Sequence, residues 1–361
     1  MFWETQLVTI LFVFFAKAVI AKSAVPALFA FGDSILDTGN NNNLLAITKC
    51  NYPPYGRDFQ GGIPTGRCCN GKVPTDLIAR SLGIKETVPA YLSSNLSPHD
   101  LVTGVCFASA GSGIDDLTAT SQGVLPVPAQ LGMFRDYIGK VTALVGQQQA
   151  ADIISNSVYL VSVGNNDIAI TYTRLATTLP FPLYAARLID TTSKFFKNLY
   201  GLGARKVWVF STVPLGCLPG GRTVAGGPLR ICAFLENQLA QIFNAQLSSA
   251  VNSIRATLPN YDIKFIDVYT PLLNIINNPQ PAGFIDVSEA CCGTGAYGIS
   301  GICTLLSVCS NPSTYVFWDF AHPTERAYQF VVSSILHSHT NTNTNTNNVS
   351  NSSVNSSSLL S

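Results

Sequence analysis

One histidine of this chain has a carboxylate nearby in sequence, at a spacing suited to general-base catalysis. His322 lies in the segment WDFAHPTE, three residues after Asp319. In a turn that leads into a helix, a carboxylate at this spacing can lie beside the imidazole, fix its tautomer and stabilise the imidazolium. An equally simple interpretation is that Asp319 caps the helix and His322 is a surface residue. The other histidines are weaker candidates, because His99 lies in a polar stretch and His337 and His339 border a polar tail.

Ser34 lies where a nucleophile for such a base is expected. It follows the apolar run 27–31 in the segment FGDSILDTGNNN, where Gly32 permits a tight turn. Ligands of open α/β sheets bind beyond the carboxyl ends of the strands. Taken alone, however, a Gly-Asp-Ser triplet is better explained by Asp33 and Ser34 as helix caps. The chain has no G-x-S-x-G elbow, so a serine hydrolase of this sequence must use a different turn.

Two further segments contain candidate donors for an oxyanion, which acyl transfer must stabilise. In VCFASAGSG, Gly111 and Gly113 let the backbone approach a ligand closely, and in VSVGNND, Asn165 and Asn166 follow an apolar run. The first segment could equally be a phosphate-binding glycine loop, and the second a simple turn. The phosphate alternative fails on spacing, because no G-x-x-x-x-G-K-[ST] or complete G-x-G-x-x-G fingerprint follows a strand.

The elements that must position these segments alternate along the chain. Apolar runs bounded by turn residues predict buried parallel strands at 27–31, 158–163, 207–210 and 263–268. Helical patterns occupy 74–82, 129–154, 183–200, 232–258 and 324–336. Strands alternating with helices predict an α/β fold, a single doubly wound domain with a mainly parallel sheet flanked by helices. The stretch from about 39 to 71 has neither period and is predicted to be a long surface loop.

Composition limits the class of protein. The chain has 361 residues, 47% hydrophobic and 11% charged, which is typical of one well-packed domain. Its formal net charge is +1, and the sequence has no basic cluster of the kind that a nucleic-acid binder needs. Nucleic acid is therefore not an expected partner.

The two ends of the chain differ from its body. An apolar run at 7–15, followed by small residues near 21–24, predicts a signal peptide over 1–24, with a retained anchor as the alternative. No other stretch is apolar enough to span a bilayer. The hydrolase domain is predicted over 25–338, and the Asn-, Ser- and Thr-rich segment 339–361 is a predicted disordered tail. Candidate glycosylation acceptors are Asn95, Asn348, Asn351 and Asn355.

Ten cysteines in an exported chain predict disulfides. Cys217 with Cys232, and pairs within 291–309, would close short loops and are the favoured pairings. A zinc site is the weaker alternative, because Cys291 and Cys292 are adjacent and no second CxxC pair completes a thiolate site. The chain therefore points to a secreted, extracellular protein.

The four segments around Ser34, Gly111, Asn166 and His322 occur in an order that resembles the plant GDSL esterase/lipase family of the SGNH hydrolase superfamily. The segments YGRDF, PTGR, VPLGCLP, CCGTG and YVFWDFAHPTERAY extend the resemblance over nearly all of 26–336. It implies a flavodoxin-like three-layer fold, with Ser34 as nucleophile and Asp319 and His322 completing a triad. It also implies that the Ser34 amide, the Gly111 amide and the Asn166 side chain bind the oxyanion.

Two positions depart from this family pattern. Cys106 stands where many relatives carry Asn, which could loosen support for the oxyanion loop. Cys68-Cys69 replaces a more usual Phe-Ser, and would add a disulfide or leave a reactive thiol.

The sequence thus predicts a monomeric, secreted hydrolase of carboxylic esters that forms an acyl-enzyme on Ser34 and uses no metal and no cofactor. Two alternatives remain: an acyltransferase that uses the same acyl-enzyme, and a non-catalytic accessory protein that binds esters or lipids. The acyl and alcohol groups of the ester are not determined. The aromatic residues Tyr52, Tyr55 and Phe59 could line an acyl site, although packing against one another is the simpler interpretation.

Overall fold

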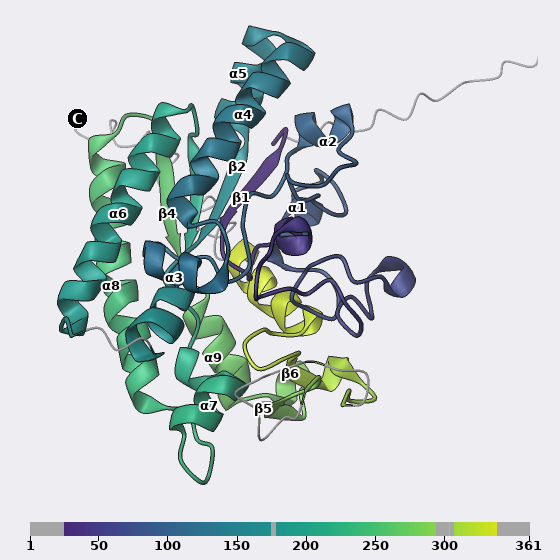
Figure 1. Cartoon of the computed structure of the whole chain (residues 1–361), viewed down its shortest axis with the longest axis vertical. Helices are drawn as coiled ribbons and strands as arrows, with labels where there is room; N and C mark the ends of the chain where they lie inside the picture. Colours follow the sequence, from purple (N-terminus) through teal and green to yellow (C-terminus); the bar gives the residue numbers. More distant parts are fainter. Residues whose placement is uncertain (1–24, 175–177, 294–302, 304–306, 338–361) are drawn as a thin grey trace, which may run out of the picture.

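The centre of the molecule is a parallel sheet of four strands in the order β1-β2-β3-β4 (Figure 1). The computed structural model describes residues 25–337 apart from 175–177, 294–302 and 304–306. The strands are β1 (Leu28–Gly32), β2 (Val158–Ser162), β3 (Lys206–Phe210) and β4 (Asp262–Ile266). Every residue of β1 and β2 is buried, which explains why their sequences show no polar alternation. The predicted parallel α/β sheet is confirmed, and each strand lies within two residues of its predicted bounds.

A short extended segment continues the sheet on the other side of β1. The backbone N–H of Phe107 donates to the carbonyl of Ala30 at 2.7 Å, and that of Ser109 donates to Gly32 at 2.9 Å. The chain therefore leaves β1 in one direction to reach this segment and returns in the other direction to form β2. Open α/β sheets bind their ligands at such a reversal, beyond the carboxyl ends of the strands, which here is the end of β1.

Helices cover both faces of the sheet. In Figure 1, α4, α6 and α8 lie on one side of it, and α1 and the C-terminal helix (325–337) lie on the other. The helices are α1 (Pro74–Ser81), α2 (Pro98–Thr103), α3 (Asp116–Gln122), α4 (Val127–Val145), α5 (Gln147–Asn156), α6 (Phe181–Gly201), α7 (Pro219–Ala225), α8 (Phe234–Thr257) and α9 (Tyr269–Asn277).

The single helix predicted over 129–154 is wrong. Two helices, α4 and α5, occupy this stretch and meet at Gly146. Gly146 has φ +85°, a conformation that ends a helix and that favours glycine. The apolar period continues across the break, so the period alone concealed it.

Two features near the carboxyl end were not predicted as strands. Strands β5 (Asp286–Ala290) and β6 (Tyr315–Phe317) form a small second sheet, and the chain turns after β6 toward Asp319. The sequence of β5 is polar and half exposed, so it gave no hydrophobic signal.

The predicted long loop contains only two short 3₁₀ turns, η1 (Asn40–Asn43) and η2 (Gln60–Gly62).

Four disulfides join eight of the cysteines. They are Cys50–Cys68, Cys217–Cys232, Cys291–Cys309 and Cys292–Cys303. The predicted Cys217–Cys232 bond and the pairing within 291–309 are confirmed. Cys69 and Cys106 are unpaired and buried.

Several predictions concern residues that lie outside the described ranges or on the surface. The signal peptide over 1–24, the tail over 339–361, and Asn348, Asn351 and Asn355 lie outside the described residues. Asn95 is exposed, as a glycosylation acceptor must be. Within the described ranges, no helix combines the length and the hydropathy that a membrane span requires.

Candidate active site

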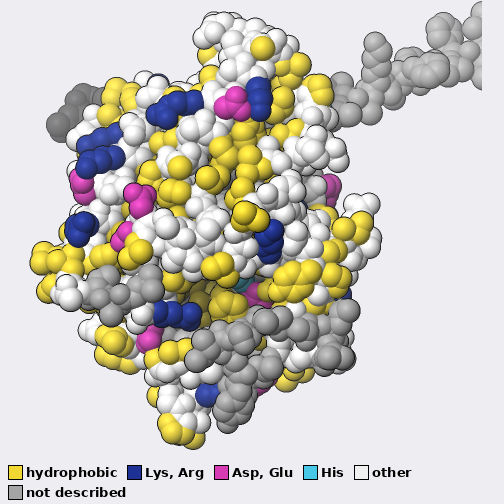
Figure 2. Space-filling model, in the orientation of Figure 1, with side chains coloured by type: hydrophobic (Ala, Val, Ile, Leu, Met, Phe, Trp, Pro, Cys, Tyr) yellow, Lys and Arg dark blue, Asp and Glu magenta, His cyan; other side chains and the backbone are white. Residues whose placement is uncertain are grey.

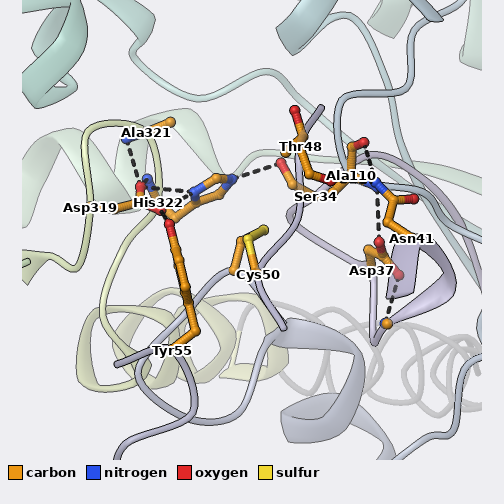
Figure 3. The surroundings of a disulfide bond; sticks show 12 residues. Ser34, Asp37, Asn41, Thr48, Cys50, Tyr55, Ala110, Asp319, Ala321 and His322 are labelled. Carbon is orange, nitrogen blue, oxygen red and sulfur yellow. Dashed lines mark hydrogen bonds and ion pairs between the residues drawn. A yellow bond between two sulfur atoms is a disulfide. The ribbon is translucent and has the colours of Figure 1, made fainter. Parts of the chain in front are cut away.

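Ser34, His322 and Asp319 form a continuous hydrogen-bonded chain beyond the carboxyl end of β1 (Figure 3). Ser34 Oγ lies 2.8 Å from His322 Nε2. His322 Nδ1 lies 2.8 Å from Oδ1 and 2.9 Å from Oδ2 of Asp319. All three residues are buried, so bulk water does not compete for these bonds. Because Nδ1 is engaged by the carboxylate, Nε2 is left to accept the Ser34 proton.

Asp319 is held by three donors besides the imidazole. The backbone N–H groups of Ala321 and His322 each donate to its Oδ1 at 2.8 Å. The hydroxyl of Tyr55 donates to Oδ2 at 2.7 Å (Figure 3). Burial and the Asp319 charge raise the pKa of Tyr55 well above its usual value, so Tyr55 keeps the proton that it donates.

The Asp319 carboxylate and the His322 imidazole shift each other's pKa. Burial raises the pKa of Asp319 and is the largest single effect, but the charge and hydrogen bond of His322, together with the hydrogen bonds from the Ala321 backbone and Tyr55, hold it below its ordinary 3.8. Burial lowers the pKa of His322 and is the largest single effect, but the charge and hydrogen bond of Asp319, together with the charge of Asp33, outweigh it and raise this pKa above 6.5. The ion pair between them is therefore favoured over the neutral pair.

The turn that carries Ser34 is enforced by its neighbours. Gly32 has φ +121°, and a Cβ there would overlap the carbonyl oxygen of Ser162 on β2, so only glycine fits. Asp33 accepts hydrogen bonds from Ser162 Oγ at 2.9 Å and from Asn165 Nδ2 at 2.9 Å. Asp33 therefore ties the turn to the residues after β2, rather than merely capping a helix.

The two candidate oxyanion segments are hydrogen-bonded to each other and to the residues just before Ser34, through Ser109 to Gly32 and through Asn165 to Asp33. Asn166 begins a π-helical turn (Asp167–Tyr172), and its Nδ2 donates to the carbonyl of Ser112 at 2.9 Å, beside Gly111. An amide nitrogen carries two hydrogens, so the second is available to a ligand. Among the described residues, the backbone N–H groups of Ser34 and Gly111 have no hydrogen-bond acceptor. These donors are free to bind a developing oxyanion.

The run of asparagines after Ser34 anchors the segment that leads to Gly111, a role that was not predicted. Asn40 Nδ2 donates to the carbonyls of Cys106 and Ala108 at 2.8 and 2.7 Å. Asn41 Nδ2 donates to the carbonyl of Ala110 at 2.7 Å. Asp37 accepts from the Ala110 backbone N–H at 2.9 Å (Figure 3). The GNNN run was the sequence signal for this role, but it was interpreted as part of a polar surface loop.

The two departures from the family pattern are both accommodated. The Cys106 thiol donates to the carbonyl of Leu36 at 3.2 Å, and burial raises its pKa to about 12. The segment beside it is held through the backbone by Asn40, so Cys106 does not loosen the loop. Cys68 pairs with Cys50, and burial raises the pKa of Cys69 well above its usual value. Cys69 is thus a buried thiol rather than a reactive one.

The remaining candidates lie apart from this cluster. His99 and His337 are exposed, and His339 lies outside the described residues. Tyr55 packs edge-on against Tyr52 and Trp318, so this part of the aromatic loop packs on itself while it supports Asp319. Across the described ranges, no group of three or more His, Cys, Asp or Glu side chains is arranged to hold a metal ion.

Comparison with known proteins shows that the chain is similar to ester hydrolases. The family model of GDSL-like lipases and acylhydrolases matches residues 28–335. The Arabidopsis thaliana protein GDSL esterase/lipase At1g23500 is 48% identical, over 91% of this chain and 93% of that relative. GDSL esterase/lipase EXL3 of the same plant is 44% identical, over 92% of this chain and 94% of that relative.

Two solved structures are more distantly similar. The extracellular lipase of Streptomyces rimosus is 14% identical with a TM-score of 0.39, and covers 86% of this chain and 100% of its own. The acetylxylan esterase Axe2 of Geobacillus stearothermophilus is 12% identical with a TM-score of 0.35, and covers 87% of this chain and 94% of its own.

Proposed function

Because the chain belongs to the family of GDSL-like lipases and acylhydrolases, and is a serine hydrolase of carboxylic esters, we propose that Ser34 is its nucleophile. His322 is the general base, and Asp319 orients the imidazole and stabilises its protonated form. The observation that carries this proposal is the chain of hydrogen bonds from Ser34 Oγ through His322 to the Asp319 carboxylate. Such a chain is the arrangement that activates a serine hydroxyl.

The reaction then proceeds in two halves. His322 Nε2 removes the Ser34 proton while Oγ attacks the ester carbonyl, and the carbonyl oxygen becomes an oxyanion. The backbone N–H groups of Ser34 and Gly111 and the Asn166 side-chain amide donate to that oxygen. His322 gives its proton to the leaving alcohol, which leaves an acyl-enzyme on Ser34. A water molecule, deprotonated by the same nitrogen, attacks the acyl carbon. The bond from this carbon to Ser34 Oγ then breaks, His322 returns the proton to Oγ, and the acid is released.

The test is substitution of the proposed nucleophile in the full-length chain. Ser34→Ala should abolish hydrolysis of nitrophenyl acetate and labelling by a fluorophosphonate, since both need Oγ. His99→Ala is the control, because this exposed histidine lies apart from the site and its loss should change neither readout. Turnover by Ser34→Ala within tenfold of the wild type would show that another residue is the nucleophile.

We further propose that the enzyme is secreted and works as a monomer. Residues 1–24 would be removed as a signal peptide, 25–338 form the hydrolase domain, and 339–361 remain as a tail. Four disulfides support an oxidising compartment, and exposed Asn95 suits glycosylation there. The near-zero net charge supports a small ester, rather than nucleic acid, as the partner.

A further inference from the structure

A cavity of about 130 Å³ borders the site next to His322. Phe320 and Ala321, the two residues before His322, form one edge of it. Ala169, three residues after Asn166, lines it from the π-helical turn. The cavity thus touches both the segment that holds the general base and the segment that holds an oxyanion donor. Figure 2 shows a hollow on this face of the molecule with hydrophobic side chains in it.

The wall opposite the π-helical turn is fixed in place. Leu215, Leu218 and Val224 line it from the turn before α7 and from α7 itself. The backbone N–H of Gly220 donates to the Phe320 carbonyl at 2.8 Å, and the Cys217–Cys232 disulfide closes the loop around α7. A wall held this way presents a preformed apolar surface rather than one that must fold around a ligand.

On the basis of the proposed function, we propose that this cavity binds the acyl group of the ester. After the alcohol leaves, water must reach the acyl carbon from the His322 Nε2 side, so the alcohol path must stay open to solvent. The acyl group instead remains attached to Ser34 through both halves of the reaction. A mainly apolar surface suits the group that stays and not the path that water takes.

The size of the cavity sets the class of acyl group. An engineered protein cavity of about 150 Å³ holds one benzene molecule, so 130 Å³ admits a chain of about six carbons. Two charged residues, Arg174 and Glu236, also line the cavity, and Glu236 Oε2 is buried without a hydrogen-bond partner among the described residues. A longer chain would have to pack against these two charged side chains without offering either of them a hydrogen bond, which is unfavourable. The preferred esters are therefore those of short aliphatic acids.

The experiment measures kcat/KM for nitrophenyl esters from acetate to dodecanoate. The wild type should rise from acetate to an optimum near hexanoate and then fall. Ala169→Leu fills the cavity from the π-helical turn, and Val224→Phe fills it from α7. Each should lower the hexanoate-to-acetate ratio of kcat/KM about tenfold, the effect of leaving about two methylenes unburied. Two variants on opposite walls keep the test valid if one of them does not fold.

Ala151→Leu is the matched control, on an exposed position of α5 remote from the cavity, and should keep the wild-type profile. An unchanged ratio in both filling variants would overturn the acyl assignment. The filling variants are also measured with acetate esters of aliphatic alcohols of increasing length. If they change the preference for alcohol length instead, the cavity binds the alcohol and the acyl assignment is overturned. Failure of the proposed function is distinct, because the wild type would then hydrolyse none of the esters.

Discussion

The hydroxyl of Tyr55 and Oδ2 of Asp319 lie 2.7 Å apart although 264 residues separate them in sequence. The same Oδ2 lies 2.9 Å from His322 Nδ1, so Tyr55 and the imidazole share one carboxylate oxygen. Tyr55 is thus a positioning residue that acts through Asp319, and its removal should leave the carboxylate freer to rotate and more basic.

Tyr55→Phe should lower kcat about tenfold with little change in KM, which corresponds to one hydrogen bond to a charged group. A more basic Asp319 also raises the pKa of His322, so the acid limb of the rate profile should move to higher pH. Tyr200→Phe is the matched control, because its hydroxyl donates to the Pro259 carbonyl away from the site. A drop in melting temperature without the shift of the acid limb would mean that Tyr55 is only structural.

The raised pKa of His322 predicts where activity is lost on acidification. The imidazole must be neutral to take the Ser34 proton, so kcat/KM should fall tenfold per pH unit below this pKa, with a midpoint above 6.5. Asp319→Asn removes the charge that raises the pKa, so the remaining activity should have its midpoint at lower pH. Its turnover should fall by about 10⁴, as in the serine-protease triad, because the wrong tautomer is favoured. An unmoved midpoint would contradict the electrostatic role of Asp319.

Asn166→Ala should reduce kcat by about 10² to 10³ and change KM little, because the oxyanion charge exists only in the transition state. Asn166→Asp should be at least as damaging, since it places a negative acceptor where negative charge develops. A turn residue without a donor role would tolerate Asp. Both are measured with one ester after their melting curves are compared, and Asn156→Asp, at the end of α5, serves as the control. Near-normal turnover by Asn166→Asp would remove the donor role.

Asn40→Asp should destabilise the fold by about 2 to 5 kcal/mol, because two buried carbonyls lose their donor and face a carboxylate instead. Urea unfolding followed by circular dichroism measures the change. Asn43→Asp is the control, because Asn43 belongs to the same 3₁₀ turn and is exposed. Equal stabilities for the two variants would show that Asn40 does not hold the segment before Gly111.

Thiol titration checks the cysteine pairing. Ten cysteines less the eight in four disulfides leave two, Cys69 and Cys106. The folded protein should react slowly with a thiol reagent because both are buried, and the unreduced protein in denaturant should show two thiols per chain. A count of ten thiols in the unreduced, denatured protein would contradict the four disulfides and the secretion proposal that they support.

Residue types and local spacing were enough to predict the four strands of the central sheet and most of the long helices. They also indicated His322 with Asp319 as a candidate base, whereas the choice of Ser34 over a simple helix cap depended on the family resemblance. What was missed depends on contacts between distant segments. Tyr55 looked like part of an aromatic loop because its partner Asp319 lies near the other end of the chain. Asn40 looked like a polar loop residue because side-chain donors to a remote backbone leave no periodic signal. Gly146 was missed because one apolar period runs through both α4 and α5.

The separation between the two ends of the active site also has a consequence for biosynthesis. Ser34 and His322 are 288 residues apart, and His322 lies just before the final helix. A chain still emerging from the ribosome therefore contains the serine long before it contains the base, and domains of this size fold largely as units. A chain that has not yet docked this segment lacks the proposed base, so a truncated or half-folded product should be inert toward esters. Recovery of esterase activity after denaturation is accordingly a direct reporter that the carboxyl-terminal segment has docked.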